Sequence, residues 1–433
     1  MPVEIFRAAL FHTPKNPFHE ADALIHFDDG ALAVEEGRVL ECGDYARVSA
    51  ACREATVHDL RGGFILPGFV DTHVHFPQTR ILGGLGYTLL DWLEQLTLPE
   101  EARLADANYA ATVAAEFVDA LAAHGTTTAL VFGSHFAGAT AALFDAAAKR
   151  GLRVASGLVM SDRRLRPELH QSPEDAHRDG CALIEEFHGR GRLRYAVTPR
   201  FALSASEAML ECCQSLLAAC PGGLFTTHIN ENAKEIDEVA RLFPWARDYL
   251  HVYERYELVG RRSVLAHNVH ARADELRRLR VQHASIAHCP ASNAALGSGI
   301  FPMSLHVAAG VRFALGSDVG GGTGFGMIKE ALNAYLMQRI APAPMILAPA
   351  MMLYLATRAG AEALAMDEET GDFSAGKSAD FVILDPPRDG VLRTRLRRAE
   401  SPDQQLAAVF TLAGTESIRE VRVGGEIVFT RPG

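Results

Sequence analysis

The stretch LPGFVDTHVHFPQ, residues Leu66 to Gln78, places two histidines two positions apart at the end of an apolar, β-branched run. Side chains alternate along a β-strand, so His73 and His75 would point to the same side and could bind one metal ion. Because the 433 residues include 18 histidines, about one such pair is expected by chance. The rest of the chain must decide whether this pair has a chemical role.

Between about residues 67 and 370, short β-branched runs alternate with alanine- and leucine-rich helical segments. The eight runs are ILPGFVDTHVH, TTTALVFGSH, RVASGLVMSD, LRYAVTPRF, LFTTHINE, SVLAHNVH, ASIAHCPASN and FALGSDVGG. Eight strand–helix units over about 300 residues predict an α/β protein with a (β/α)8 barrel of the TIM type. A doubly wound sheet is the alternative, but we find no glycine-rich phosphate turn at a strand end.

The two ends of the chain share a different pattern, in which apolar and polar residues alternate around glycine turns. ALAVEEGRVLECGD turns at Gly37, and EVRVGGEIVF turns at Gly424 and Gly425, as in β-hairpins. Terminal strands can pair once the middle closes on itself. We therefore predict a small composite β-sandwich domain from residues 1–66 and 371–433, with the barrel over residues 67–370.

Composition excludes several function classes. The net charge of −11 argues against a nucleic-acid partner. Seven cysteines without paired C-x-x-C spacing predict reduced thiols and a cytoplasmic location. The most apolar window, APAPMILAPAMMLYLA, contains three prolines and is shorter than the roughly 20 residues of a membrane helix. No secretory signal is visible, and no membrane partner is expected.

Five of the eight runs end in side chains that metal-dependent hydrolases use. These are His73 and His75, His228 with Glu231, His267, His288, and Asp318. Any one of them could be a hydrogen-bonded core residue. All five strand ends, however, open on the face where barrel enzymes carry their active sites. The pattern as a whole therefore predicts a metal-dependent hydrolytic site.

These motifs resemble the metal-dependent amidohydrolases and, within them, the guanine deaminases. The resemblance covers nearly the whole chain, in PGFVDTHVH, THINE, LAHNVH, SIAHCPASN, ALGSDVGGG and GDFSAGKSADFVILD. HVHFPQ followed by DWLEQLTLPEEARL, and TPRFALSAS, resemble the guanine-specific signatures. Ala291 and Ser317 stand where that family usually has Asn and Thr, at positions not expected to touch the reacting atoms.

The resemblance implies a single Zn²⁺ per chain, with one position left open for water. Its implied ligands are His73, His75, His228 and Asp318. Relatives with two metals use a lysine at the fourth strand, where this chain has Thr198, Pro199 and Arg200. His267 matches the histidine that hydrogen-bonds the metal-bound water.

The implied reaction is the hydrolytic deamination of guanine to xanthine and ammonia, which requires proton transfer. Asp318 is expected to accept a proton as water attacks C2. Glu231 is expected to protonate N3 and later to help deliver a proton to the departing amine. With His267, these are the predicted catalytic residues. Glu231 could instead be a carboxylate that interacts with the dipole of the following helix.

The predicted substrate-binding residues are Gln78, Arg200, Phe201 and His228. Gln78 offers an amide donor and acceptor, Arg200 a planar fork for O6, and Phe201 a ring to cover the purine face. As alternatives, Gln78 could cap its loop and Arg200 could pair with a barrel carboxylate.

Two other functions stay open at this point. One is a related aminohydrolase acting on 8-oxoguanine, a pterin or a triazine. The other is a catalytically silent scaffold, which would be expected to lose metal ligands that this chain keeps. The resemblance further implies a homodimer, because relatives are commonly dimers.

Overall fold

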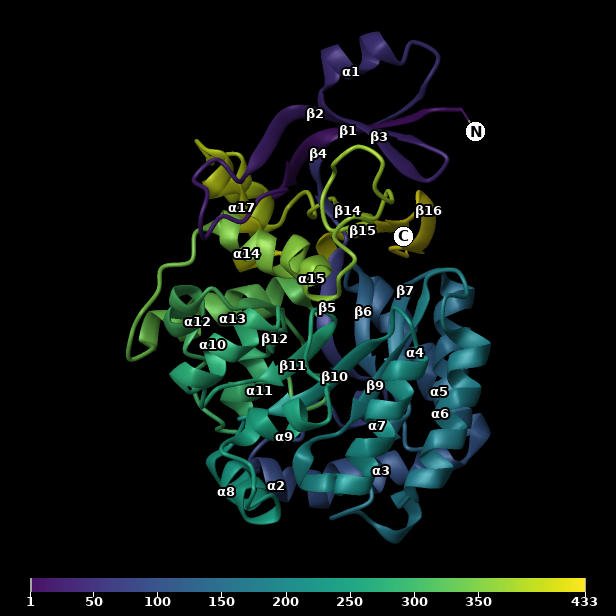
Figure 1. Ribbon diagram of the computed structural model, residues 1–433. Coiled ribbons are helices and arrows are strands. Elements are labelled where there is room, and N and C mark those ends of the chain that lie inside the picture. The colour runs from purple at the N-terminus through teal and green to yellow at the C-terminus, as the bar shows by residue number, and fades with distance from the viewer. Residues whose placement is uncertain (1, 433) are drawn as a thin grey trace.

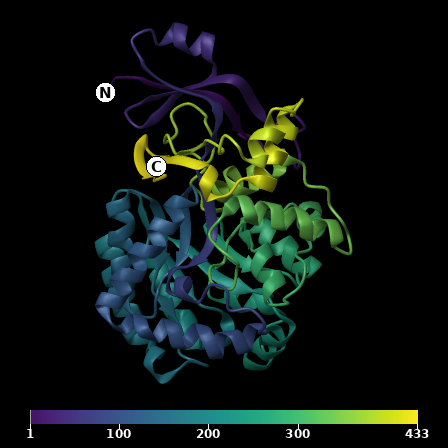
Figure 2. The same ribbon diagram turned by 180° about the vertical axis from the view of Figure 1, so that it is seen from behind.

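The computed structural model describes residues 2–432, and its two β-sheets have different shapes and origins. One sheet curls into a barrel built from the middle of the chain, and the other packs across one end of that barrel (Figures 1 and 2). Both ends of the chain lie on the side of the second sheet (Figure 1). No helix among residues 2–432 combines the length and apolar character needed to cross a bilayer.

The barrel confirms the eight predicted strands. In chain order they are β5 (Phe69–His75), β6 (Thr126–Phe132), β7 (Arg153–Gly157), β9 (Leu193–Pro199), β10 (Leu224–Ile229), β11 (Ser263–His267), β12 (Ser285–His288) and β13 (Arg312–Leu315). Neighbours pair in parallel and in this order, and the short β8 (Val159–Met160) adds to β9. The α/β barrel fold is therefore as the alternating pattern predicts.

Hydrogen bonds between β5 and the segment after β13 join the first and last strands. The amide of Asp318 donates to the carbonyl of His73 at 2.8 Å, and the amide of His75 donates to the carbonyl of Val319 at 3.0 Å. Closure of the barrel therefore brings Asp318 beside the two histidines of the opening motif.

The terminal segments form one seven-stranded sheet in the order β16-β15-β14-β4-β1-β2-β3. Its strands are β1 (Glu4–His12), β2 (Ile25–Glu35), β3 (Arg38–Asp44), β4 (Thr56–Pro67), β14 (Phe381–Leu384), β15 (Ile418–Val423) and β16 (Glu426–Thr430). The β2–β3 and β15–β16 hairpins are confirmed, with Gly37, Gly424 and Gly425 all at positive φ as such turns require. The predicted domain limits at residues 66 and 370 stay predictions.

Helices cover the barrel and fill the space beside the terminal sheet (Figure 1). Those of the barrel are α4 (Ala107–Ala123), α5 (Ala137–Arg150), α6 (Pro173–Phe187), α7 (Glu207–Ala219), α8 (Ala233–Leu242), α9 (Tyr249–Arg255), α10 (Ala273–Val281), α11 (Pro290–Ala295), α12 (Met303–Ala309), α13 (Met327–Ile340), α14 (Pro349–Ala356) and α15 (Arg358–Ala363). The remaining α-helices are α1 (Tyr45–Ala51), α2 (Leu89–Trp92), α3 (Leu98–Ala102), α16 (Val391–Leu396) and α17 (Pro402–Leu412).

Local sequence explains where these helices begin and end. Asp106 caps α4 by accepting from the amides of Asn108 and Tyr109. Ser172 caps α6, and Pro173 occupies its first turn, where the missing amide hydrogen is not needed. Gly151 ends α5 with a φ of 83°, a conformation that glycine adopts without strain.

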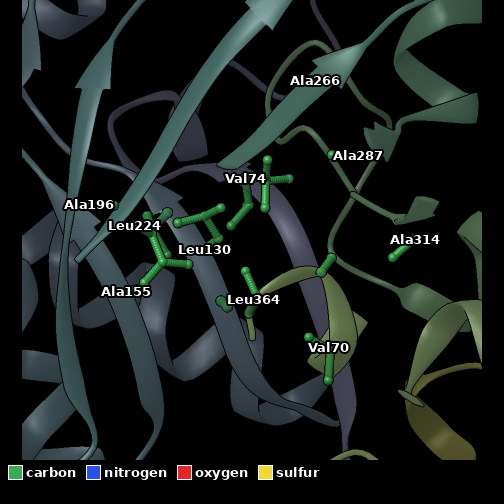
Figure 3. Packing of buried hydrophobic residues seen from close by; sticks show 14 of the residues in the cluster. Val70, Val74, Leu130, Ala155, Ala196, Leu224, Ala266, Ala287, Ala314 and Leu364 are labelled. Atoms are coloured by element: carbon green, nitrogen blue, oxygen red, sulfur yellow. The ribbon is translucent and has the colours of Figure 1, made fainter. Parts of the chain in front are cut away.

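The core inside and around the barrel is apolar and tightly filled. Val74, Leu130, Ala155 and Leu224, from four different strands, gather between the ribbons (Figure 3). Small residues, Ala266, Ala287 and Ala314, occupy matching positions on three neighbouring strands. This packing fixes the strands, so the side chains at their carboxyl ends have a rigid support.

Candidate active site

Four buried side chains at the carboxyl ends of the barrel strands lie close enough to hold one metal ion. His73 and His75 come from β5, His228 from β10, and Asp318 follows β13. One ligand atom of each lies within 4.8 Å of the others. The terminal sheet joins the opposite ends of the strands, because β4 leads through Gly68 into the start of β5.

The spacing of these donor atoms fits a single ion. Nε2 of His75 lies 3.2 Å from Nε2 of His73 and 3.2 Å from Oδ1 of Asp318, and Nε2 of His73 lies 3.3 Å from the same oxygen. Ligand atoms at 2.0–2.1 Å from a tetrahedral zinc are about 3.3 Å apart. Two imidazole nitrogens and a carboxylate oxygen at this separation therefore suit a shared cation.

The protonation states also fit a metal site. Burial lowers the pKa of His73 to about 3, and burial likewise lowers the pKa of His75 and of His228. Burial raises the pKa of Asp318, but its hydrogen bonds to His73 and His75 outweigh this and hold that pKa well below the usual value. Three neutral imidazoles and one carboxylate are the forms that bind a divalent ion.

Neighbouring groups orient the ring of His228 and hold the backbone of His73. Nδ1 of His228 lies 2.5 Å from the carbonyl oxygen of Arg200 and donates a hydrogen bond to it. Nε2 of the neutral ring then keeps a free lone pair that can bind a metal. Asp71 accepts from the backbone amides of His73 and Ser317, which ties β5 to the segment after β13. Ser317 thus contacts Asp71 at the back of the site.

Glu231 and His267 lie together beside these four side chains. Oε2 of Glu231 is 3.5 Å from Nε2 of His267, which is in turn 3.8 Å from Oδ2 of Asp318. Nδ1 of His267 donates to the side-chain oxygen of Asn293 at 2.9 Å, so Nε2 faces the two carboxylates. Burial raises the pKa of Glu231 to about 7. A carboxyl with this pKa can both give and take a proton near neutral pH.

Two residues at these strand ends have an unusual backbone conformation. His267 has a φ of 73° and Asp318 a φ of 48°, both in the left-handed region that non-glycine residues seldom adopt. Such conformations persist only where the surroundings hold them, and they cluster at functional sites.

The predicted base-reading residues line the pocket above the four donors. Gln78, Arg200 and Phe201 all contribute to its wall, and the ring of Phe201 lies 6.1 Å from that of His228. Arg200 pairs with a buried carboxylate, Glu101, which is one of the alternatives considered for it. Its Nε and Nη2 have no hydrogen-bond partner within residues 2–432, so they are available to a ligand.

Apolar side chains close the pocket from the outside. Leu89, Trp92 and Leu93 lie on α2 and on the π-helical turn that follows it (Leu93–Thr97), and Leu296 follows α11. The free volume is about 20 Å³, which is room for about one water molecule. A ligand larger than a water molecule would need part of this wall to move.

Sequence reasoning did not single out Glu101, His135 or the apolar wall. His135 ends its strand run in the same way as the other strand-end histidines, and Glu101 belongs to the quoted DWLEQLTLPEEARL motif, so both signals were present. His288, in contrast, lies outside the four-residue group, and its ring stacks on Phe301 with the centroids 4.4 Å apart.

Comparison with known proteins agrees with this architecture. Residues 64–428 match the model of the amidohydrolase family, and the chain therefore belongs to that family. Within it, the similarity is to guanine deaminases. A probable guanine deaminase of Deinococcus radiodurans is 58% identical, with 99% of each chain covered. The guanine deaminase of Escherichia coli is 38% identical over 97% of this chain and 95% of its own. The crystal structure of guanine deaminase from Bradyrhizobium japonicum superposes with a TM-score of 0.95 at 33% identity, with both chains fully covered.

Proposed function

We propose that this protein is a hydrolase that deaminates guanine to xanthine and ammonia with the help of one bound Zn²⁺. The observation that carries the proposal is a single pocket lined by His75, His228 and Asp318 of the four-residue group and by Glu231, Gln78, Arg200 and Phe201. The similarity to proteins named guanine deaminases supports the choice of substrate.

The four donors would hold the metal, and the metal when bound would supply Lewis acidity that makes water a nucleophile near neutral pH. Zinc is proposed because three imidazoles and one carboxylate suit it. Oδ2 of Asp318 lies 3.8 Å from Nε2 of His267, and Asp318 would accept a proton from the attacking water. His267 would orient that water from the other side.

Glu231 would carry protons between the water, the ring and the leaving group. Its pKa of about 7 lets it be protonated when the base binds, give that proton to N3, and later help protonate the departing amine. Ser298 donates to Oε1 of Glu231 at 3.2 Å and leaves Oε2 on the side of His267. One water is consumed, and one ammonia leaves from C2.

The remaining residues would bind the base and exclude solvent. Phe201 would cover the purine face, and Gln78 and Arg200 would contact its polar edge. His228, at the floor of the pocket, would also touch the substrate. The Leu89, Trp92 and Leu93 wall would keep bulk water away from the charged groups.

The test is a substrate panel with the purified, zinc-loaded protein, with ammonia release as the common readout. Guanine should be the preferred substrate over 8-oxoguanine, a pterin and a triazine. A higher kcat/KM on any of these would move the assignment to that related aminohydrolase, and no activity on any of them would overturn the proposal. The homodimer and the cytoplasmic location stay predictions, and sedimentation equilibrium checks the first.

A further inference from the structure

Glu101 is a buried carboxylate that hydrogen-bonds two of the proposed base-reading residues. It is 3% exposed and lies on α3, directly after the π-helical turn that forms the pocket wall. Its oxygens accept from Nη1 of Arg200 at 2.9 and 2.8 Å and from Nε2 of Gln78 at 3.0 Å. A side chain that bonds both residues fixes their positions relative to each other.

The ion pair between Glu101 and Arg200 is well compensated. Burial raises the pKa of the Glu101 carboxyl, but the charge of Arg200 and the neighbouring His135 hold it far below its usual range. Nδ1 of His135 lies 3.4 Å from Oε2 of Glu101. A carboxylate in this environment stays ionised and holds the guanidinium firmly, because an unpaired buried charge is costly.

The hydrogen bonds of Gln78 settle which way its amide faces. Its Oε1 accepts from the amide of Gly320 at 3.1 Å, while its Nε2 donates to Glu101. The second hydrogen on Nε2 of Gln78 can then be donated to a ligand in the pocket, and so can the hydrogens on the unpaired nitrogens of Arg200. Both residues therefore present hydrogen-bond donors to a ligand, and this edge of the pocket suits an acceptor.

We propose that Glu101 is a positioning residue that holds Arg200 and Gln78 as paired donors, so that the site selects purines carrying a carbonyl oxygen at C6. The inference rests on the proposed function. It assigns a role to the DWLEQLTLPEEARL motif, which neither the metal group nor the proton-transfer residues explain. It also makes the pocket discriminate against a hydrogen or an amine at C6, since the donors would then lack an acceptor.

The test compares two variants of Glu101 with a neighbouring control. Glu101→Gln removes the charge, and Glu101→Asp keeps the charge but withdraws the carboxylate, so we expect the second variant to be less destabilised than the first. The control is Glu100→Gln, because Glu100 is on the same helix but contacts Arg103 and Tyr109 outside the pocket. Melting temperature and zinc content show that each variant is folded and loaded.

Two readouts separate positioning from general damage. The first is the kcat and KM for guanine, and the second is the Kd, from titration calorimetry, for hypoxanthine and for unsubstituted purine. We expect KM for guanine and Kd for hypoxanthine to rise roughly 10- to 100-fold in both Glu101 variants. Kd for purine, which has no oxygen at C6, should change by less than about threefold, and kcat should fall less than KM rises.

Several results would contradict this role. A folded, zinc-loaded Glu101→Asp protein with an unchanged KM and an unchanged Kd for hypoxanthine would overturn it. Parallel weakening of hypoxanthine and purine binding would show a merely structural effect and would also overturn it. If the unmodified protein does not deaminate guanine, the proposed function fails, while the calorimetric comparison still decides whether Glu101 controls recognition of the carbonyl group.

Discussion

Replacement of Glu231 by Gln isolates proton transfer from every other property of the site. The oxygen that accepts from Ser298 is kept. The new amide group can donate to Nε2 of His267, whose other nitrogen already donates to Asn293. Burial raises the pKa of Glu231 to about 7, so burial already favours its neutral form and a neutral amide is a close substitute. The fold and the metal content should therefore hardly change.

The activity that Glu231→Gln loses should appear as a lower kcat. A general acid–base group contributes about 10²- to 10⁴-fold, equivalent to about 3–5 kcal/mol of activation free energy. Formation of xanthine is followed by absorbance, zinc by atomic absorption, and xanthine affinity by calorimetry. Affinity for xanthine, the product, should change little.

The matched control is Asp237→Asn, an exposed carboxylate on the same stretch of chain, in α8. It should leave kcat unchanged. A Glu231→Gln enzyme with the kcat of the unmodified protein would refute the proton-transfer role, and a variant that loses zinc would refute the claim that Glu231 is separate from the metal site.

Three further predictions concern the metal content, the recognition of guanine and the stability of the fold. The purified protein should contain about one Zn²⁺ per chain, and His73→Ala should lose both zinc and activity; two equivalents that are both needed for activity would contradict the single-ion site. Arg200→Ala should raise KM and lower kcat/KM for guanine by roughly 2–4 kcal/mol at normal zinc content, and unchanged kinetics would remove Arg200 from recognition. Burial raises the pKa of Glu330 from 4.5 to about 8, so its carboxyl favours the folded state most below pH 4.5 and this contribution is lost as pH rises toward 8. The melting temperature of the unmodified protein should therefore fall between pH 4.5 and 8, and Glu330→Gln should lack the part of this fall that Glu330 causes. If melting temperature depends on pH in the same way for both proteins, Glu330 is not protonated in the folded state.

The barrel and the cluster of four possible metal ligands could be predicted because their signals are local. Each barrel strand is a short β-branched run, and the four donor residues lie within three positions of the end of a strand. The carboxyl ends of parallel strands meet on one face of a barrel. His73, His75, His228 and Asp318 are therefore brought together by a rule that a single sequence reveals.

The contacts of Glu101 could not be predicted in this way. Glu101 and Arg200 are 99 positions apart, and Glu101 lies on a short helix with no periodic pattern to place it. The fold itself decides which carboxylate reaches Arg200, through the path of the chain between β5 and α4. The single sequence allowed a barrel carboxylate as a partner for Arg200 but did not say which one.

The mixed origin of the terminal sheet has a consequence for synthesis of the chain. β4 pairs on one edge with β1, but its other edge pairs with β14, whose first residue is Phe381. A ribosome adding 5–20 residues per second needs roughly 15–60 s to make the intervening chain. During that time the edge of β4 at Phe64, Ile65 and Leu66 has no partner strand, and such an edge can pair with another nascent chain. Aggregation during expression should therefore depend more on translation speed and chaperone supply than on the stability of the finished protein.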